Sequence, residues 1–376
     1  VGNLDILSRA DRRMAKSINR FDRDMWLLNT PGGIVDLRTG AMRPPSPADY
    51  CRKMTAAAPG GDCPEWLSFI DQVTVGDAAL AGFLKRWAGY CLTGSVKEEK
   101  FVFFYGQGGG GKGTFLTTLE RALGDYAITT PMSTFTKRDR GNEVPADLAD
   151  LNSSRMVIAQ ENEEGKKWNE ERLKMCTGSD TIKARFMRQN FFQFVPTFKL
   201  SFAGNFKPQL DNVERGMRRR FLLVPFTNVL PIAQQDIELK DRLRAEFPGI
   251  LQWALEGCLE WQRDGLGLPP VIAEATEEYF AEQDLTAQFI AQCTEQVPGN
   301  RLSVGALYDR YVVWCEAVGE DRKERRRFCE AMDTHGLHRV KTSLTVGGVR
   351  KTGVDAFNGI DLINDWKNPP AGDAWS

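Results

Sequence analysis

The feature that most constrains the fold is a glycine-rich turn between an apolar segment and a lysine. Phe101–Tyr105 is apolar, five of the six residues from 106 to 111 are glycine, and Lys112 follows at once. Glycines let backbone N–H groups turn inward around an anion, and a helix that starts here adds the positive end of its dipole. The spacing matches the GxxxxGK pattern and predicts a nucleoside triphosphate site. The predicted phosphate-binding residues are Gly106, Gly108, Gly109, Gly110, Gly111, Lys112, Gly113 and Thr114.

One departure from this pattern concerns the metal ligand. The residue after the lysine is ordinarily Ser or Thr, whose hydroxyl binds Mg²⁺, but this chain has Gly113. Thr114 carries the nearest hydroxyl and is the metal ligand that we predict from the loop. A solvated glycine-rich turn is the alternative. The lysine spacing and the apolar run before it favour ATP and Mg²⁺ as cofactors.

Two further side chains stand where a nucleotide-hydrolysing site needs them. The apolar run Met156–Ala159 is followed closely by Glu161, which we predict holds hydrated Mg²⁺ and polarises the attacking water. Glu163 is an alternative for that role. Both glutamates are also typical of solvated charges in a surface loop, which is the alternative without a catalytic role. The run Leu200–Ala203 leads to Asn205, whose amide is placed to orient water against the γ-phosphate. By itself, Asn205 is equally typical of a turn.

Consecutive arginines precede another apolar run. Arg218, Arg219 and Arg220 come just before Phe221–Phe226. Adjacent guanidinium groups repel each other unless an anion is near, so we predict that these arginines reach the γ-phosphate of a neighbouring subunit. That role requires a ring or filament of copies of this chain. A solvated basic turn is the alternative.

A local basic excess is hidden by the net charge of −1. Between Lys183 and Arg220 there are nine basic residues and two acidic ones. Strands over 181–187 and 191–195 are predicted to form a hairpin around Arg188-Gln-Asn190, with Lys183, Arg185 and Arg188 as the predicted contacts to single-stranded DNA. The nearby phenylalanines are assigned to hairpin packing in preference to base stacking; they are Phe191, Phe192, Phe194 and Phe198.

The fold class expected from the apolar runs is α/β. Four continuous apolar runs without alternation, separated by helical spacing, indicate a parallel sheet covered on both faces. We predict an N-terminal domain over 1–64, the nucleotide-binding core with a helical lead-in over 65–230, a helical extension and linker over 231–270, a winged helix over 271–367 and a disordered tail over 368–376. Eleven basic and seven acidic residues between Arg301 and Lys351 allow DNA contact by the winged helix.

Composition excludes several classes of protein. The eight cysteines are scattered without a CxxC pair, and no cysteine lies near His335 or His338, so we expect reduced thiols in a cytosol-like compartment and no zinc site. No apolar run approaches the length of a membrane span, and no signal peptide is present, so no membrane partner is expected. The chain begins with Val1 instead of Met, as expected for a fragment of a longer protein.

The order of these features resembles a superfamily 3 helicase of the phage and plasmid primase–helicase type, related to the poxvirus primase–helicase. The likeness runs from about Trp26 to Leu362. It rests on the phosphate loop, the Glu161 strand, Lys174 with Thr177-Gly178-Ser-Asp180, the basic hairpin, the strand ending in Asn205, the arginines before Pro225-Phe226, the segment Leu28–Gly40, the approach Gly89–Gly94 and the segment Tyr308–Glu316.

The resemblance implies a P-loop AAA+-like ATPase core with a helicase-associated N-terminal domain and a C-terminal winged helix. It implies Lys112 for phosphate, Glu161 for the acidic motif, Asn205 as sensor and Arg219 or Arg220 as finger. Lys-Gly-Thr occurs in this family, whereas Gly110 replaces a frequent Asn and Gln160 replaces a second acid. The implied activity is ATP-driven DNA unwinding by a hexamer moving 3′ to 5′ at a phage-type fork in a bacterial host cytoplasm, with a possible primase domain upstream of Val1.

Two other functions fit parts of this pattern. A small-molecule phosphotransferase also needs the loop and Mg²⁺, but it has no use for a basic hairpin or arginines acting between subunits. A DNA-binding initiator or loader uses ATP to control assembly without unwinding. Acceleration of ATP hydrolysis by single-stranded DNA separates the first from a helicase, and strand displacement separates the second.

Overall fold

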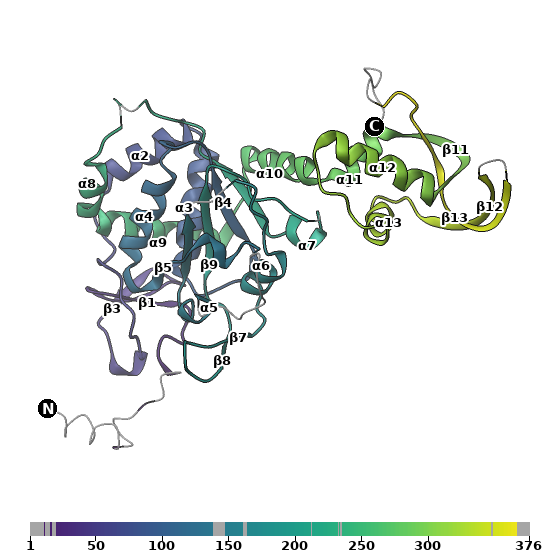
Figure 1. Ribbon diagram of the computed structural model, residues 1–376. Coiled ribbons are helices and arrows are strands. Elements are labelled where there is room, and N and C mark those ends of the chain that lie inside the picture. The colour runs from purple at the N-terminus through teal and green to yellow at the C-terminus, as the bar shows by residue number, and fades with distance from the viewer. Residues whose placement is uncertain are drawn as a thin grey trace. The chain divides into compact units, whose positions relative to one another are not determined.

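The computed structural model describes residues 20–137, 147–160, 164–211, 213–231, 235–346 and 349–366, together with residues 11, 16 and 233. The chain forms two compact units, Val1–Tyr279 and Phe280–Ser376 (Figure 1). Two sets of predictions lie outside the described residues: those for Glu161 and Glu163, and that for the tail 368–376.

A five-stranded parallel sheet forms the centre of the first unit. Its spatial order is β10-β4-β9-β6-β5. This confirms the predicted parallel sheet, and the four apolar runs all lie in its strands. The edge strand β5 was not predicted, because three residues are too few to show a pattern. The strands are β4 (Phe101–Tyr105), β5 (Ala127–Thr129), β6 (Met156–Gln160), β9 (Lys199–Gly204) and β10 (Phe221–Pro225).

Both faces of the sheet are buried, which explains why its strands are continuously apolar. On one face, Val102 and Phe104 join the main core with the helices that cover it. On the other face, Phe101 and Phe103 pack edge-on against Trp168, which also contacts Phe202. Successive side chains of β4 therefore point into two different apolar layers.

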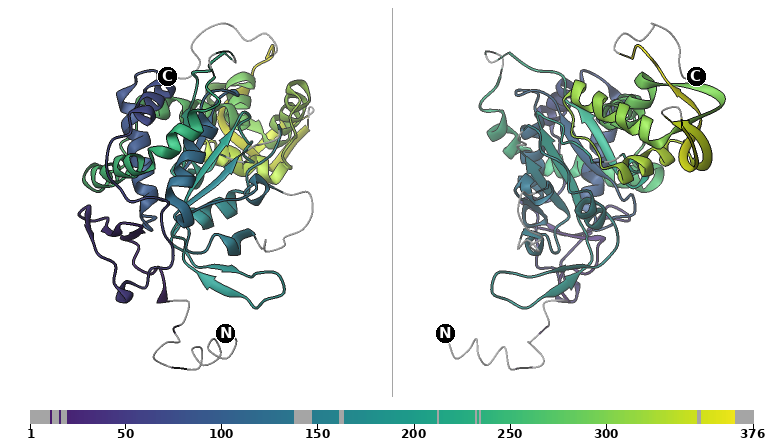
Figure 2. Two further views of the ribbon diagram at one scale, coloured as in Figure 1. Left: turned by 90° about the vertical axis from the view of Figure 1, so that its left-hand side faces the viewer. Right: turned by 45° about the vertical axis from the view of Figure 1, so that its right-hand side comes forward.

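The main core is completed by long helices that lie on one side of the sheet (Figures 1 and 2). Helix α3 packs along α9, and the indole N–H of Trp87 in α3 donates to Ser201 Oγ at 3.0 Å. Helix α2 begins where the carboxylate of Glu246 accepts from the backbone N–H groups of Glu65 and Trp66, at 3.0 and 2.9 Å. The helices are α2 (Pro64–Thr74), α3 (Ala78–Leu92), α4 (Lys112–Leu123), α8 (Leu239–Ala245) and α9 (Phe247–Asp264).

A small antiparallel sheet and a two-stranded hairpin complete the strands of the first unit. The sheet consists of β1 (Leu27–Thr30), β2 (Gly33–Asp36) and β3 (Ala41–Arg43). The hairpin consists of β7 (Ile182–Ala184) and β8 (Phe192–Phe194), with Lys183 opposite Gln193. The strands are shorter than predicted, but the hairpin occurs where the sequence places it.

The remaining described elements up to residue 283 are three 3-10 turns and four helices. They are the 3-10 turns η2 (Pro47–Asp49), η3 (Gly124–Tyr126) and η4 (Met132–Thr134), and the helices α5 (Asp147–Asp150), α6 (Glu170–Thr177), α7 (Arg215–Arg218) and α10 (Pro270–Gln283). The segments predicted as separate domains over 1–64, 65–230 and 231–270 share one compact unit with one main core.

The second unit has its own core of aromatic and apolar side chains, which includes Phe289, Tyr311, Trp314, Phe328 and Phe357. Its sheet has the antiparallel order β11-β13-β12. Strand β11 was not predicted from the sequence. The elements are α11 (Leu285–Cys293), β11 (Thr294–Ser303), α12 (Val304–Val318), α13 (Arg325–Thr334), β12 (Arg339–Val346) and β13 (Val349–Leu362).

All eight cysteines are free thiols. Within the described ranges, no helix combines the length and apolarity that a membrane span needs.

Candidate nucleotide site and nucleic-acid interface

Lys112 is the first residue of α4 and directly follows the glycine-rich loop that begins after β4. Its ammonium donates to the carbonyl oxygens of Gly106 and Gln107, at 2.6 and 2.9 Å, and to Oδ1 of Asn205 at 3.2 Å. The side chain is buried, and this desolvation lowers the pKa of Lys112 from its usual range. The cation is thus anchored to its own loop and to the residue predicted as sensor.

Two loop glycines have conformations that other residues do not tolerate. Gly111 caps the N-terminus of α4 at φ 86°, and a Cβ there would lie 2.7 Å from Cγ1 of Val73. Gly106 approaches the backbone so closely that a Cβ would lie 2.0 Å from the carbonyl oxygen of Phe226. The loop therefore combines left-handed backbone with close packing, which requires glycine.

The carboxyl ends of three neighbouring strands bring the predicted site residues together. Tyr105 of β4 pairs with Gly204 of β9, and Gln160 of β6 pairs with Ala203. Gln160 Oε1 lies 3.6 Å from the position of a Cβ on Gly113. The end of β6 is therefore beside the loop, and the chain continues from it directly into residue 161.

A cavity of about 620 Å³ borders the loop. One wall is the loop itself, including Thr114, and the other comes from α2, α8 and the segment before α8. In this second wall, Arg242 forms ion pairs with Asp236 at 2.5 Å and Glu65 at 3.2 Å. The volume is in the range of small-molecule sites. Sequence reasoning missed this second wall, since no motif marks it; it includes Glu65, Ser68, Gln72, Asn228, Gln235, Lys240 and Arg242.

The two candidate finger arginines have different environments. Arg220 is buried and donates to Thr177 Oγ1 at 3.1 Å, to the Gly216 carbonyl at 3.2 Å and to Glu99 at 2.9 Å. Arg219 is exposed over 61% of its side chain and pairs with the same Glu99 oxygen at 3.0 Å. Arg220 is thus held inside the unit, and Arg219 is the one placed to reach outward.

The basic hairpin presents its cations beside exposed aromatic rings. Lys183 and Arg185 lie over the ring of Phe191, at 4.7 and 5.0 Å from its centroid, and Phe186 stacks on Phe192. Arg188 has a left-handed backbone with φ 61° in the connecting loop. Phe191 is 48% exposed and Phe186 37%.

The predicted packing role of the phenylalanines holds for three of the four, since Phe192 stacks on Phe186 and Phe194. Phe194 and Phe198 are buried, whereas Phe191 is exposed and Phe192 half-buried. The exposed rings beside the hairpin cations are therefore Phe186 and Phe191.

One cation counted in the basic excess is buried. Lys199 donates to the carbonyl of Thr93, lies 4.8 Å from the ring centroid of Tyr90 and is 2% exposed. Burial lowers the pKa of Lys199 to about 7. This lysine is part of the core beneath the sheet and adds nothing to the surface field of the hairpin segment.

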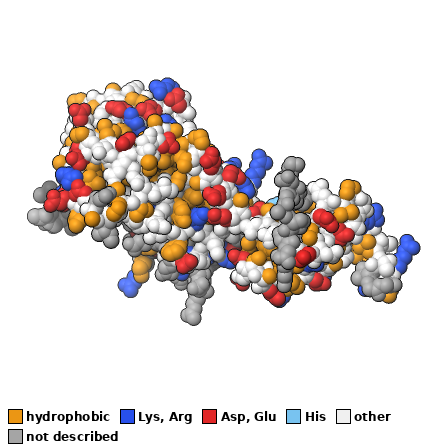
Figure 3. Space-filling view, turned by 90° about the horizontal axis from the view of Figure 1, so that it is seen from above, with side chains coloured by type: hydrophobic (Ala, Val, Ile, Leu, Met, Phe, Trp, Pro, Cys, Tyr) orange, Lys and Arg blue, Asp and Glu red, His pale blue; other side chains and the backbone are white. Residues whose placement is uncertain are grey.

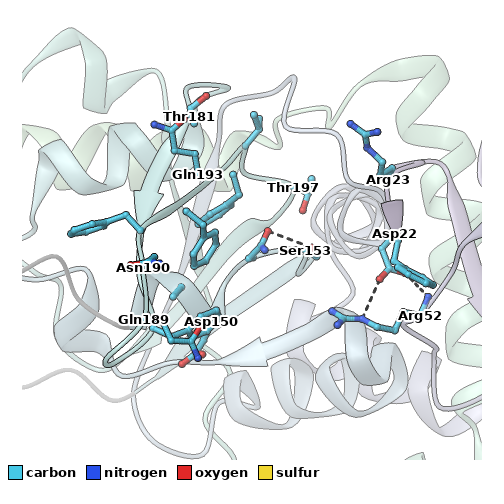
Figure 4. A pocket seen from close by; sticks show the side chains of 18 of the residues that line it. Asp22, Arg23, Arg52, Asp150, Ser153, Thr181, Gln189, Asn190, Gln193 and Thr197 are labelled. Atoms are coloured by element: carbon cyan, nitrogen blue, oxygen red, sulfur yellow. Dashed lines mark hydrogen bonds and ion pairs between the residues drawn. The ribbon is translucent and has the colours of Figure 1, made fainter. Parts of the chain in front are cut away.

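A second cavity, of about 1370 Å³, lies beside the hairpin. Figure 4 shows Thr181, Asn190 and Gln193 of the hairpin segment on one side and Asp22 and Arg52 on the other. The carboxylate of Asp22 accepts from the backbone N–H groups of Arg52 and Lys53, which joins the two N-terminal segments. Aromatic, amide and basic side chains thus line one groove.

The fold and the loop define an α/β protein in which a glycine-rich loop joins the carboxyl end of a central parallel strand to a helix. Residues 4–75 match a sequence family described as D5 N terminal like. Residues 104–220 match one described as a family of unknown function, DUF5906.

Two viral proteins are similar in sequence. "Putative helicase L207/L206" of Acanthamoeba polyphaga mimivirus is 23% identical over 323 residues, which are 79% of this chain and 34% of that protein. "Putative helicase 022R" of Frog virus 3 (isolate Goorha) is 28% identical over 274 residues, 66% of this chain and 28% of that protein. The chain therefore spans about a third of the length of these curated relatives.

A solved structure, described as the A form apo structure of the NrS-1 C terminal region, has a similar fold. The TM-score is 0.52 at 12% identity, over 81% of this chain and 77% of that one. At 12% identity this likeness is one of fold, and the sequence matches show that the chain is similar to viral proteins named as putative helicases.

Proposed function

We propose that this chain is the ATP-driven motor of a DNA helicase, working as a hexameric ring that moves 3′ to 5′ on single-stranded DNA. The observation that carries the proposal is the meeting of Lys112, Asn205 and the end of β6 at the carboxyl edge of one parallel sheet, beside a cavity of nucleotide size. Two viral relatives named as helicases support the same function.

The loop fits the triphosphate of ATP. Gly106 and Gly111 leave no space for side chains, and the N-terminal end of α4 faces the cavity through Lys112 and Gly113. Lys112 exchanges its carbonyl partners for phosphate oxygens, and Asn205 then orients the attacking water. We therefore propose that this loop is the P-loop of an AAA+-like core.

Magnesium, when bound, neutralises charge on the β- and γ-phosphates. Thr114 lines the cavity with its loop neighbours and supplies a hydroxyl oxygen, the type of ligand that Mg²⁺ prefers. Glu161 supplies the carboxylate in this proposal, because it directly follows Gln160 at the end of β6.

Arg219 completes the site of the neighbouring subunit. Its guanidinium is exposed and shares its acidic partner with Arg220, so it is free to move without breaking the buried contacts of Arg220. We therefore propose Arg219 as the arginine finger and Arg220 as a residue that helps to position it.

The hairpin contacts the translocating strand through Lys183, Arg185 and Arg188. Its exposed rings add stacking that every base offers, so binding is independent of sequence. The second unit has the order helix, strand, helix, helix, strand, strand with a three-stranded antiparallel sheet, and we propose that it is a winged helix.

The decisive experiment combines two variants with two assays. Lys112→Ala should lose ATP binding and hydrolysis, whereas Glu161→Gln should bind ATP and fail to hydrolyse it. In the parent, single-stranded DNA should accelerate hydrolysis, and ATP should drive strand displacement from a forked substrate. ATP turnover unaffected by DNA would favour a small-molecule phosphotransferase, and DNA-stimulated turnover without displacement would favour an initiator or loader.

A further inference from the structure

Glu99 lies where the side chains of the two candidate finger arginines meet. Its Oε2 atom is 3.0 Å from a guanidinium nitrogen of Arg219 and 2.9 Å from one of Arg220. Figure 3 shows acidic and basic side chains interspersed on the first unit, at the left of the view. Exposed ion pairs of this kind ordinarily contribute little. The Glu99 group differs from them, because one carboxylate oxygen serves two cations and one of these cations is buried.

The backbone around this group is held in place by two successive contacts. The Lys100 ammonium donates to the carbonyl oxygen of Arg219 at 2.8 Å. The next residue, Phe101, donates its backbone N–H to the carbonyl oxygen of Arg220, also at 2.8 Å. The start of β4 is therefore joined to the arginine segment directly after Glu99. A change in the contact between Glu99 and Arg219 must come from movement of their side chains.

The side chain of Arg220 is fixed, whereas that of Arg219 lies at the surface. The Arg220 side chain is 8% exposed and also donates to Thr177 Oγ1 and to the carbonyl oxygen of Gly216. It therefore presents one N–H to the Glu99 carboxylate in a constant direction. The Arg219 side chain is 61% exposed and approaches the same oxygen from outside. Arg220 thus fixes the carboxylate, and the carboxylate holds Arg219.

A phosphate group would compete with this carboxylate for Arg219. A terminal phosphate carries about two negative charges and three acceptor oxygens, and arginine binds phosphate through two parallel hydrogen bonds. The Glu99 carboxylate has a single charge, which it already shares with Arg220. A γ-phosphate presented by a neighbouring subunit would therefore draw Arg219 away from Glu99. Without that phosphate, Arg219 would stay on the carboxylate.

We propose that Glu99 is a positioning residue for the arginine finger. Its carboxylate holds Arg219 in a withdrawn position, and Arg219 leaves it for the γ-phosphate of a nucleotide bound by the neighbouring subunit. This inference rests on the proposed function, because it needs Arg219 to act between subunits. It adds that engagement of the finger must overcome an attraction that Glu99 sets.

The test measures kcat/KM for ATP hydrolysis by the full chain at low and high ionic strength. This ratio compares free protein and substrate with the transition state, so it includes the withdrawal of Arg219 from Glu99. Glu99→Gln keeps an acceptor oxygen for Arg220 but removes the negative charge. It should raise kcat/KM by up to about five-fold, the equivalent of one exposed ion pair. Because salt screens exposed charges, the gain should shrink between about 0.05 and about 0.5 M salt.

Two further variants complete the test. Glu277→Gln is the matched control, since Glu277 is 69% exposed and pairs with Arg218 at 2.7 Å, one residue before the finger. Its kcat/KM should equal that of the parent. Glu99→Asp keeps the charge on a shorter side chain, so its gain should be smaller than that of Glu99→Gln. Aspartate also tolerates the left-handed backbone of residue 99, where φ is 51°, so this variant should fold even if Glu99→Gln does not.

An active parent with unchanged or lower kcat/KM in the folded Glu99 variants would overturn this inference and leave the proposed function intact. A gain that persists at high salt would also overturn it, because its cause would then not be the lost charge. A parent without ATP turnover would reject the proposed function and this inference together. Thermal unfolding identifies any variant that has lost its fold.

Discussion

Arg219 and Arg220 are adjacent in sequence, yet their replacement by alanine should have opposite effects on stability and activity. Arg219→Ala removes one exposed ion pair with Glu99, and such pairs are worth about 1 kcal/mol or less. Arg220→Ala removes a buried guanidinium with three hydrogen bonds and leaves the Gly216 carbonyl and the Thr177 hydroxyl without this donor. A buried acceptor that loses its donor costs about 1–3 kcal/mol, so the two acceptors together should cost about 3 kcal/mol.

Thermal unfolding should show this difference directly. For a domain of this size, 1 kcal/mol corresponds to about 2–4 °C, so Arg220→Ala should lower Tm by about 6–12 °C and Arg219→Ala by about 4 °C at most. Arg218→Ala is the matched control, because Arg218 pairs with the exposed Glu277. Comparable losses for Arg219→Ala and Arg220→Ala would refute the assignment.

Activity should follow the reverse order. Arg219→Ala should bind ATP and fail to hydrolyse it, and mixing it with the Lys112→Ala variant should restore turnover, because one subunit then offers an arginine and the other an intact loop. Normal hydrolysis by Arg219→Ala would show that Arg219 is not the arginine finger. Absence of rescue in demonstrably mixed oligomers would argue against a shared site.

Three further outcomes are expected. Gly111→Ala should abolish nucleotide binding in a titration, because its Cβ meets Val73 and its φ is positive, and parental affinity would contradict this. Lys183→Ala and Arg188→Ala should weaken single-strand binding regardless of sequence, and at least one should block unwinding while DNA-independent ATPase survives; parental unwinding by both would contradict this. The lowered pKa of Lys199 means that the unfolded chain holds its proton up to higher pH, so stability should rise between about pH 7 and 10 by up to about 1.4 kcal/mol per pH unit. Lys199→Met should flatten that rise in chemical denaturation, and an unchanged slope would show that Lys199 is not the cause.

The sequence predicted those parts of the fold in which local pattern and tertiary environment agree. Runs such as Phe101–Tyr105 are apolar throughout because both faces of the sheet are covered, so their strand assignment and parallel arrangement were readable. The glycine-rich loop was readable because its conformation requires glycine. Strand β5 was missed, since three residues carry no periodicity.

The site was only partly predictable, because a charge count says nothing about burial. In the sequence, Lys199 and Arg220 cannot be distinguished from Arg188 and Arg219. In the structure, Lys199 and Arg220 are buried, whereas Arg188 and Arg219 are exposed. Other lysines form ion pairs: Lys174 pairs with Glu214, and Lys137 pairs with Asp211.

The second wall of the nucleotide cavity shows a different limit of sequence reasoning. Gln72 and Asn228 are far apart in the chain, and the Asn228 amide donates to the Gln72 carbonyl at 2.7 Å. This contact joins α2 to the segment after β10, which also supplies Phe226 beneath Gly106. The wall therefore exists only once the sheet has brought β10 next to β4, and no local spacing encodes it. A nucleotide bound in this cavity would touch the loop on one side and the joined residues Asn228 and Gln72 on the other. The shape of the cavity therefore depends on segments that carry no recognisable motif.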